Sequence, residues 1–212
     1  MQEETFRLLS WDVGIINMAY CLLEKDASGC VRITEWDVFD LTSGGKKKKR
    51  LPPLDKLRCA LIDKLEMLQN ECDTFKDLDE VIIESQPAQR MKIMAGCLYD
   101  YFYIRGWVDG KKRTKVQFVS PRMKLCTNTR AETCTYTQRK KLAIHNCQEM
   151  IAPYSHYTKL FNKHKKKDDL CDSMLQGFQY IASKDLDGNC SLSDILVIND
   201  KSEESSVTEN CG

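Results

Sequence analysis

The feature that most limits how this chain can fold is its order of segments: three strand-like segments in succession, then helix-like and strand-like segments in alternation. The first three cover residues 6–13, 18–25 and 30–41, are rich in apolar, β-branched and aromatic residues, and are joined by short turns. Consecutive strands joined in this way form an antiparallel meander. Residues 81–83, Val-Ile-Ile, form a continuous apolar run that is typical of a central strand covered on both faces.

Helical spacing of apolar residues predicts the segments that cover the sheet. Leucines three and four residues apart predict a helix over residues 54–72, and Pro87 is expected to open a helix that ends at about Arg105, before Gly106. The remaining expected segments are a fifth strand over 115–121 and helices over about 137–150 and 169–182. The sequence therefore predicts an α/β fold with a mixed five-stranded sheet and helices on both faces.

The composition indicates a globular protein. Hydrophobic residues make up 42% and charged residues 30% of the chain, and no apolar run approaches the roughly 18 residues of a membrane span. We expect one domain over residues 1–184 and a polar, partly disordered extension over 185–212. The N-terminal residues do not resemble a signal peptide, so we expect an intracellular protein without a cleaved leader.

The thiols and imidazoles do not form a metal-binding pattern. The eleven cysteines are odd in number and none are spaced as C-x-x-C, while the three histidines form no close pair. We therefore expect reduced cysteines and no zinc site.

Positive charge is bunched although the net charge is only +1. Basic runs occupy residues 44–50, 110–115, 139–141 and 163–167, which suits a polyanion such as nucleic acid. Lysines in loops also serve solubility, and for a single run both explanations remain open. The run 163–167 differs from the others because three acids follow it directly.

Carboxylates end two of the expected strands. Asp12 lies at the end of the first strand, where capping of the turn at Gly14 is the alternative to a functional role. Glu84 ends the apolar run 81–83, where a salt bridge to a lysine is the alternative. Neighbouring strands lie roughly 4.8 Å apart, so two such carboxylates can share one divalent cation.

A third group of acids begins the last expected helix. Asp169 and Asp172 are three residues apart and project from one face of a helix, whereas Asp168 points away once the helix has begun. Ordinary stabilisation of a helix N-terminus is the alternative explanation. Together with Asp12 and Glu84, the pair Asp169 and Asp172 would form an oxygen-rich set of the kind that holds one or two Mg²⁺ ions for phosphoryl transfer.

Three stretches resemble motifs of a known family. "DVGIINMAY" (12–20), "IIESQPAQR" (82–90) and "KKDDLCDSMLQG" (166–177) are similar, in this order, to motifs of the RuvC-like Holliday junction resolvases of the RNase H-like superfamily, and among them to the poxvirus and large-DNA-virus branch. The resemblance covers roughly residues 7–183. Ser173 stands where alanine is usual, and the doubled acid Asp168 leaves the register of the last motif open by one residue.

The resemblance implies a fold and an activity. The fold would be RNase H-like, and the protein would be a homodimeric endonuclease that resolves four-way junctions and other branched DNA by paired symmetric nicks. The hydrolysis would depend on Mg²⁺, with Mn²⁺ able to substitute, and would leave 5′-phosphate and 3′-hydroxyl ends. A viral protein of this kind would act in the host cytoplasm, or in the nucleus.

The resemblance also implies roles for individual residues. Asp12, Glu84, Asp169 and Asp172 would be the catalytic metal ligands, with Asp169 preferred to Asp168 because it keeps the D-x-x-D spacing. Lys124 would be a catalytic lysine near the scissile phosphate. The expected DNA-binding residues are Lys163, Lys165, Lys166, Lys167, Gln86 and Arg90.

Alternative activities remain open. One is an RNase H-like nuclease with other nucleic acid substrates, and another is a junction-binding protein without catalysis. For a dimer, the expected contact is an apolar stripe on the helix 88–105, and burial of that stripe in the core is the competing explanation; the stripe contains Met91, Met94, Leu98, Tyr101 and Phe102.

Overall fold

The computed structural model describes residues 5–42, 51–71, 75–109, 113–121, 135–164 and 166–185. Their secondary-structure elements alternate much as the sequence predicts. In chain order they are β1 (Phe6–Asp12), β2 (Met18–Lys25), β3 (Val31–Phe39), α1 (Leu54–Glu71), β4 (Glu80–Glu84), α2 (Gln89–Val108), β5 (Lys115–Val119), α3 (Tyr136–Ile151), α4 (Ser155–Lys163) and α5 (Lys167–Asp185).

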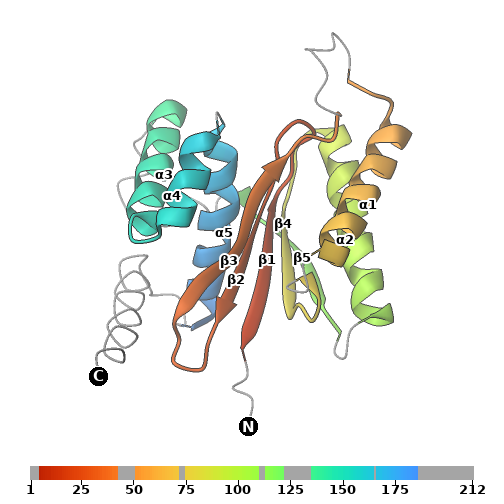
Figure 1. Cartoon of the computed structure of the whole chain (residues 1–212). Helices are drawn as coiled ribbons and strands as arrows, with labels where there is room; N and C mark the ends of the chain where they lie inside the picture. Colours follow the sequence, from red (N-terminus) through yellow and green to blue (C-terminus); the bar gives the residue numbers. More distant parts are fainter. Residues whose placement is uncertain are drawn as a thin grey trace.

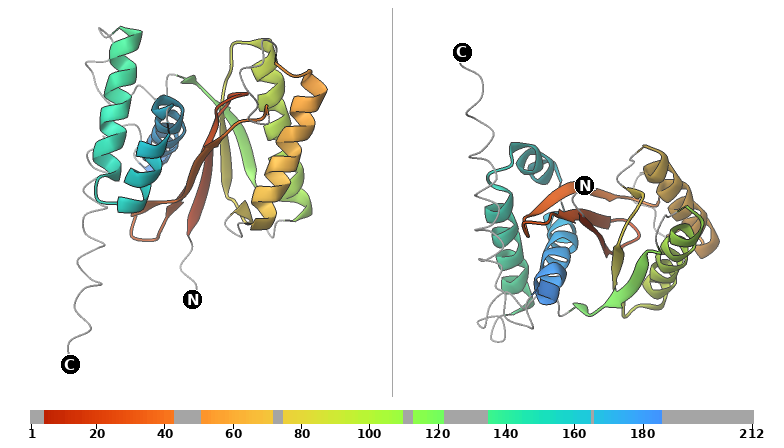
Figure 2. Two further views of the ribbon diagram at one scale, coloured as in Figure 1. Left: turned by 45° about the horizontal axis from the view of Figure 1, so that its top comes forward. Right: turned by 90° about the horizontal axis from the view of Figure 1, so that it is seen from below.

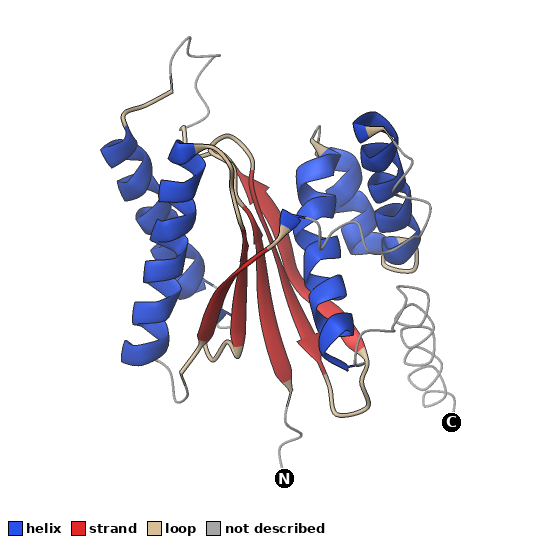
Figure 3. Cartoon of the chain, turned by 180° about the vertical axis from the view of Figure 1, so that it is seen from behind, coloured by secondary structure: helices blue, strands red, loops and turns tan. Residues whose placement is uncertain are grey.

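The described strands form one mixed sheet in the order β3-β2-β1-β4-β5. The meander β1–β2–β3 is antiparallel, whereas β4 pairs in parallel with β1, and β5 pairs in parallel with β4. Helices cover both faces: α1 and α2 lie on one side, and α3, α4 and α5 lie on the other (Figures 1 and 3). The predicted fold class, a mixed five-stranded sheet with helices on both faces, is therefore confirmed. The central strands β1 and β4 bury side chains on both faces of the sheet.

The two faces of β1 belong to two separate hydrophobic clusters. Leu9 and Trp11 pack with residues of α1 and α2, whereas Leu8 packs with residues of α3, α4 and α5. Since side chains alternate along a strand, Ser10 and Asp12 share the face of Leu8. Asp12 therefore projects toward the side of the sheet that packs against α5. Figure 2 shows α5, in blue, on that side of the sheet.

Helix α5 crosses the sheet antiparallel to β1. Lys184, near its end, lies with its Nζ 4.9 Å from the Phe6 ring at the start of β1, while Gln176 donates a hydrogen bond to the Trp11 carbonyl near the end of β1. The first turn of α5 consequently lies at the edge of the sheet where β1 and β4 end (Figure 1).

A buried carboxylate holds the other end of α5. Tyr180 donates a 2.5 Å hydrogen bond to Glu80, and Lys184 forms an ion pair with the same carboxylate, which is 8% exposed. Burial, followed by the hydrogen bond to Glu80, raises the pKa of Tyr180 well above its ordinary value. Glu80 begins β4, so these contacts fix the far end of α5 to the start of the strand that carries Glu84.

Two expectations about helices are wrong. Helix α4 was not expected, because its nine residues offer only a short apolar pattern. Helix α2 continues through Gly106 to Val108 instead of ending before it. Gly106 is required by packing: a Cβ there would lie 2.8 Å from the Thr114 Cβ, so no larger residue fits.

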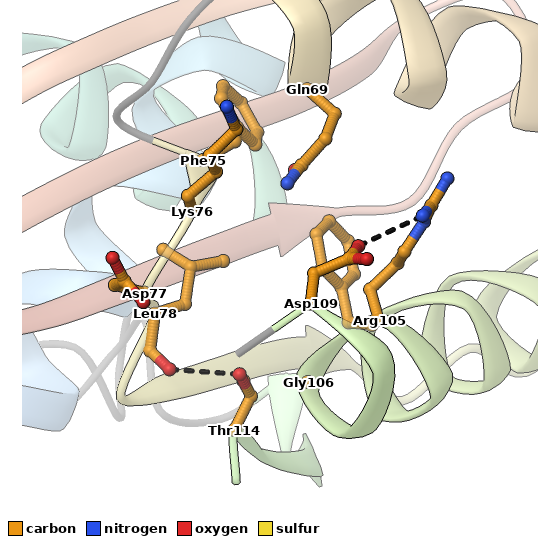
Figure 4. Close-up of a pocket in the computed structure, with 10 residues that line it drawn as sticks. Gln69, Phe75, Lys76, Asp77, Leu78, Arg105, Gly106, Asp109 and Thr114 are labelled. Carbon is orange, nitrogen blue, oxygen red and sulfur yellow. Dashed lines mark hydrogen bonds and ion pairs between the residues drawn. The ribbon is translucent and has the colours of Figure 1, made fainter. Parts of the chain in front are cut away.

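The packing around Gly106 forms a small pocket at the end of the sheet opposite to the end of β1. Thr114 donates a 2.9 Å hydrogen bond to the Leu78 carbonyl, and Arg105 pairs with Asp109 on the last turn of α2 (Figure 4). The Thr114 bond joins the segments that enter β4 and β5, and Thr114 also lies against Gly106 of α2, so we assign the pocket a structural role.

The apolar stripe expected to form a dimer contact lies in the core. Met94, Leu98 and Phe102 are at most 3% exposed and pack against the sheet, and Tyr101 is 8% exposed. Core burial, the competing explanation, is correct.

Among the described helices none is long and apolar enough to cross a membrane. The expected extension over 185–212 lies outside the described residues except for Asp185.

Two glycines of α2 provide a matched test of this packing. A Cβ on Gly96 would meet no atom within 4 Å, so Gly96→Ala should raise the free energy of unfolding by about 0.5–1 kcal/mol, the helix-propensity gain. Gly106→Ala should instead lower it by about 1–3 kcal/mol, because the new methyl group meets Thr114. Urea unfolding of both variants measures the difference, and equal effects would contradict the described contact of α2 with Thr114.

Candidate active site

Asp12 ends β1 and is 8% exposed. The turn that follows it is unusually tight, since a Cβ on Gly14 would lie 2.2 Å from the Asn17 carbonyl oxygen. Only glycine fits there, and the turn brings the chain directly into β2. The motif D-x-G-x-x-N therefore has a physical basis: it places a carboxylate at the end of a central strand and reverses the chain behind it.

Glu84 ends β4 beside Asp12. In the parallel register Trp11 pairs with Ile83, so the next residues, Asp12 and Glu84, lie at the same level of adjacent strands. Both follow residues that point toward α1 and α2, and both therefore face α5. Gln86 donates a 2.9 Å hydrogen bond to Glu84 Oε2, which makes Gln86 a neighbour of this carboxylate.

Asp169, on the first turn of α5, carries the clearest electrostatic signal. Its Oδ2 is buried and accepts a hydrogen bond from no described group. Burial, followed by the negative charges of Asp168, Asp12 and Asp172, raises its pKa to about 6, and nearby Lys166 opposes the shift. The fold therefore places Asp12, Asp169 and Asp172 close enough to repel one another.

Asp168 points to a different neighbour. Lys140 of α3 forms an ion pair with it at 2.5 Å. Burial acts to raise the pKa of Asp168, but the hydrogen bond and charge of Lys140 outweigh burial, and the net pKa is lowered. The register that uses Asp169 and Asp172, and leaves Asp168 to Lys140, is thus the one that the geometry favours.

The chemistry of these acids fits a divalent cation. Carboxylate oxygens are the ligands that Mg²⁺ and Mn²⁺ prefer, and a buried unpartnered carboxylate oxygen among like charges is stabilised by a bound cation. Within the described residues, however, no three Asp, Glu, His or Cys side chains converge closely enough to form a ready metal site. The acids are grouped at one edge of the sheet without being closed into a coordination shell.

The remaining predicted site residues lie in several environments. Lys163 and Lys166 are exposed beside the start of α5. Lys167 donates a hydrogen bond to Asn162 Oδ1, and its Nζ lies 5.0 Å from the centroid of the Phe161 ring. Arg90 is exposed and donates to the Pro52 carbonyl at 2.6 Å. Lys124 and Lys165 lie outside the described residues.

Gln176 and Lys140 were not predicted as site residues from the sequence, and Ser173 was noted only because alanine is usual at its position. Ser173 is fully buried, and its hydroxyl donates to the Leu170 carbonyl at 2.9 Å, so serine fits where alanine is usual. The available signal for Gln176 was its spacing, four residues after Asp172 and seven after Asp169 on one helix face. Lys140 could not be linked to Asp168 because the two belong to different helices.

The sequence also matches a known protein family over the segment that carries these acids. The sequence profile of the Poxvirus A22 protein family matches residues 7–184, which include all four acids. The chain belongs to this family. The expected kinship with the poxvirus branch is thereby confirmed.

Relatives and solved structures agree with the family. Uncharacterized protein L451 of Acanthamoeba polyphaga mimivirus is 30% identical over 145 residues, covering 61% of this chain and 35% of that protein. The chain thus spans about a third of this relative's length. The fowlpox virus resolvase in complex with its substrate Holliday junction DNA has a TM-score of 0.57 at 23% identity, covering 84% of this chain and 99% of that one.

A second structure shows the same fold. The yeast mitochondrial Holliday junction resolvase Ydc2 has a TM-score of 0.58 at 20% identity, covering 83% of this chain and 79% of that one. At these identities the solved structures establish the architecture of the chain, and its activity requires a separate argument.

Replacing Asp169 should stabilise the metal-free protein. Because folding raises the pKa of Asp169, the ionised carboxylate destabilises the folded state, and stability is lost as pH rises from about 4 to about 6. Asp169→Asn removes this effect, so we expect a gain of about 1–2 kcal/mol at pH 7 after allowing for partial exposure, and none below pH 4.

Asp168→Asn is the matched control. Its lowered pKa contributes stability above its titration range, so its loss should destabilise the protein modestly at pH 7. Thermal unfolding with chelator between pH 3.5 and 8 measures both effects. The same sign for the two variants at pH 7 would contradict the assigned environments.

Proposed function

We propose that this protein is a Holliday junction resolvase: a divalent-cation-dependent endonuclease that cuts four-way and branched DNA by paired symmetric nicks. The observation that carries this proposal is the buried, unpartnered carboxylate oxygen of Asp169 beside Asp12 and Asp172, in a chain of the Poxvirus A22 family. The structure of the fowlpox virus resolvase with junction DNA supports the choice of substrate.

The four acids are proposed to hold the cation, with Mg²⁺ as the natural ion and Mn²⁺ as a substitute. Asp12 and Glu84 come from adjacent strands, whereas Asp169 and Asp172 come from the helix that crosses them, so the ligands approach from two directions. When bound, the cation would stabilise the negative charge that develops on the scissile phosphate in the transition state and would lower the pKa of the attacking water. The proposed products carry 5′-phosphate and 3′-hydroxyl ends.

Positive side chains around the acids are proposed to position the DNA backbone. Lys163 and Lys166 are exposed next to the start of α5, where they can contact phosphates that flank the scissile bond. Lys165 and Lys167 belong to the same run, and Gln86 and Arg90 belong to the segment after Glu84. We assign Lys124 to the scissile phosphate on the resemblance alone.

Paired nicking requires two active sites, so we propose a homodimer. Two-fold symmetry would present one set of acids to each of two opposed strands. The stripe expected to form the contact is buried, and the exposed apolar residues at the end of α2, Ile104, Trp107 and Val108, are the described alternatives. We place the nuclease in residues 1–184 and its action inside the host cell.

The test is cleavage of a synthetic four-way junction and of a cruciform plasmid with Mg²⁺. Wild-type protein should nick opposed strands symmetrically and give linear plasmid. Asp12→Asn, Glu84→Gln, Asp169→Asn and Asp172→Asn should each reduce cleavage by at least about 10³-fold and retain junction binding, because each removes a proposed ligand and no phosphate contact.

Asp168→Asn serves as the control and should be milder than Asp169→Asn, since Asp168 pairs with Lys140. The reverse order would overturn the assigned register. Nicked circles without linear product, or stronger cleavage of RNA–DNA hybrids, would favour a general RNase H-like nuclease. Tight junction binding with no cleavage under Mg²⁺ or Mn²⁺ would favour a non-catalytic junction-binding protein.

A further inference from the structure

Gln176 connects α5 to β1 by two hydrogen bonds. It is fully buried, and its Nε2 donates to Ser10 Oγ at 3.1 Å and to the Trp11 carbonyl oxygen at 3.2 Å. The acceptors belong to Ser10 and Trp11, the two residues before Asp12 in β1. The Trp11 carbonyl belongs to the peptide group whose nitrogen is that of Asp12, so Gln176 contacts the peptide that carries Asp12.

The same residue shares a helix face with the other acids. Gln176 follows Asp172 by four residues and Asp169 by seven, and positions with this spacing lie above one another on a helix. The distance along the axis from Asp169 to Gln176 is about 10 Å, two turns. One amide group therefore links the strand end that bears Asp12 to the helix face that bears Asp169 and Asp172.

Stability alone does not account for glutamine at this position. Burying an amide oxygen without a hydrogen-bond donor is unfavourable, and Gln176 Oε1 is buried and accepts from no described group. Nearby α5 residues such as Met174 and Leu170 are apolar and fully buried. A methionine of similar length would fill the same space without that unpaired oxygen.

The helix lies close to the sheet at this level. A Cβ on the neighbouring Gly177 would lie 2.7 Å from Leu23 Cδ1 and 3.2 Å from Ser10 Cβ. Because α5 is this close, the Gln176 amide reaches the strand backbone directly. A change in either hydrogen bond would alter the position of Asp12 relative to the two acids of α5.

We propose that Gln176 is a positioning residue that sets the spacing between Asp12 and the acids of α5, and thereby the affinity of the site for a divalent cation. This inference rests on the proposed function, in which these acids bind the cation. Gln176 acts through Asp12, and we place it in contact with neither the DNA nor the cation.

The test compares Gln176→Met with Gln69→Met. Gln69 is also buried but lies on α1, at the opposite end of the sheet beside Gly106 (Figure 4). For Gln176→Met we expect the dissociation constant for Mn²⁺, measured on DNA-free protein by calorimetry, to rise about tenfold or more, the range typical of residues that support metal ligands. Junction affinity measured with chelator should be unchanged.

Cleavage should follow the same pattern. Gln176→Met should need about tenfold more Mg²⁺ for half-maximal cleavage, and excess Mn²⁺ should restore much of the rate. Gln69→Met should match the wild type in both measurements. Ser10→Ala, which removes one acceptor and leaves the Trp11 bond, should give a smaller increase in both constants than Gln176→Met.

Unchanged Mn²⁺ affinity in Gln176→Met would overturn the inference, as would an equal loss in Gln69→Met. If Gln176→Met does not fold, Ser10→Ala decides: wild-type Mn²⁺ affinity and Mg²⁺ dependence would overturn the inference. A different result would refute the proposed function: wild-type protein that binds Mn²⁺ but cuts no junction. The two failures can be told apart, because the Mn²⁺ affinities of the variants are measured without DNA.

Discussion

The packing of α5 across β1 is the constraint on which the rest of the site depends. The acids lie on elements that are far apart in the chain, and only the antiparallel crossing of helix and strand brings Asp169 and Asp172 to the end of β1. Three contacts define that crossing: the close approach at Gly177, the Gln176 bonds to Ser10 and Trp11, and the attachment of Tyr180 and Lys184 to Glu80. The Gln176 bonds and the Tyr180–Glu80 bond are polar and buried, so they specify one register of α5 on the sheet where apolar packing alone would allow sliding.

The site opposes the stability of the metal-free fold. Burial and the negative charges of Asp168, Asp12 and Asp172 oppose the ionisation of Asp169 and raise its pKa. Lys140 compensates Asp168 through a direct ion pair, but no described residue donates to Asp169 Oδ2. Such uncompensated negative charge is typical of functional sites, where a ligand supplies the missing positive charge. In this chain the ligand with the right chemistry is a divalent cation, which in turn suits phosphodiester hydrolysis.

Much of the fold could be predicted from the sequence, because strand alternation and helical spacing are local signals. β2 has the predicted bounds. Asp12 and Glu84 became candidates because each ends an apolar run, and the structure places them at the same level of adjacent strands. Features that depend on packing were missed. Gly106 looked like a helix terminus, but it is the point where Thr114 contacts α2, and the stripe of Met94, Leu98 and Phe102 looked available for a partner, but it faces the sheet. Gln176 had no local signal beyond its spacing from Asp172, since its partners precede it by more than 160 residues.

Anomalous scattering from crystals soaked with Mn²⁺ tests the central claim most directly, because it locates the cation without relying on activity. We expect Mn²⁺ at the edge of the sheet where β1 and β4 end, with oxygen ligands from Asp12 and from Asp169 or Asp172, and with Asp168 still paired to Lys140. Mn²⁺ bound only elsewhere, or coordinated by Asp168 in place of Asp169, would contradict the assigned site.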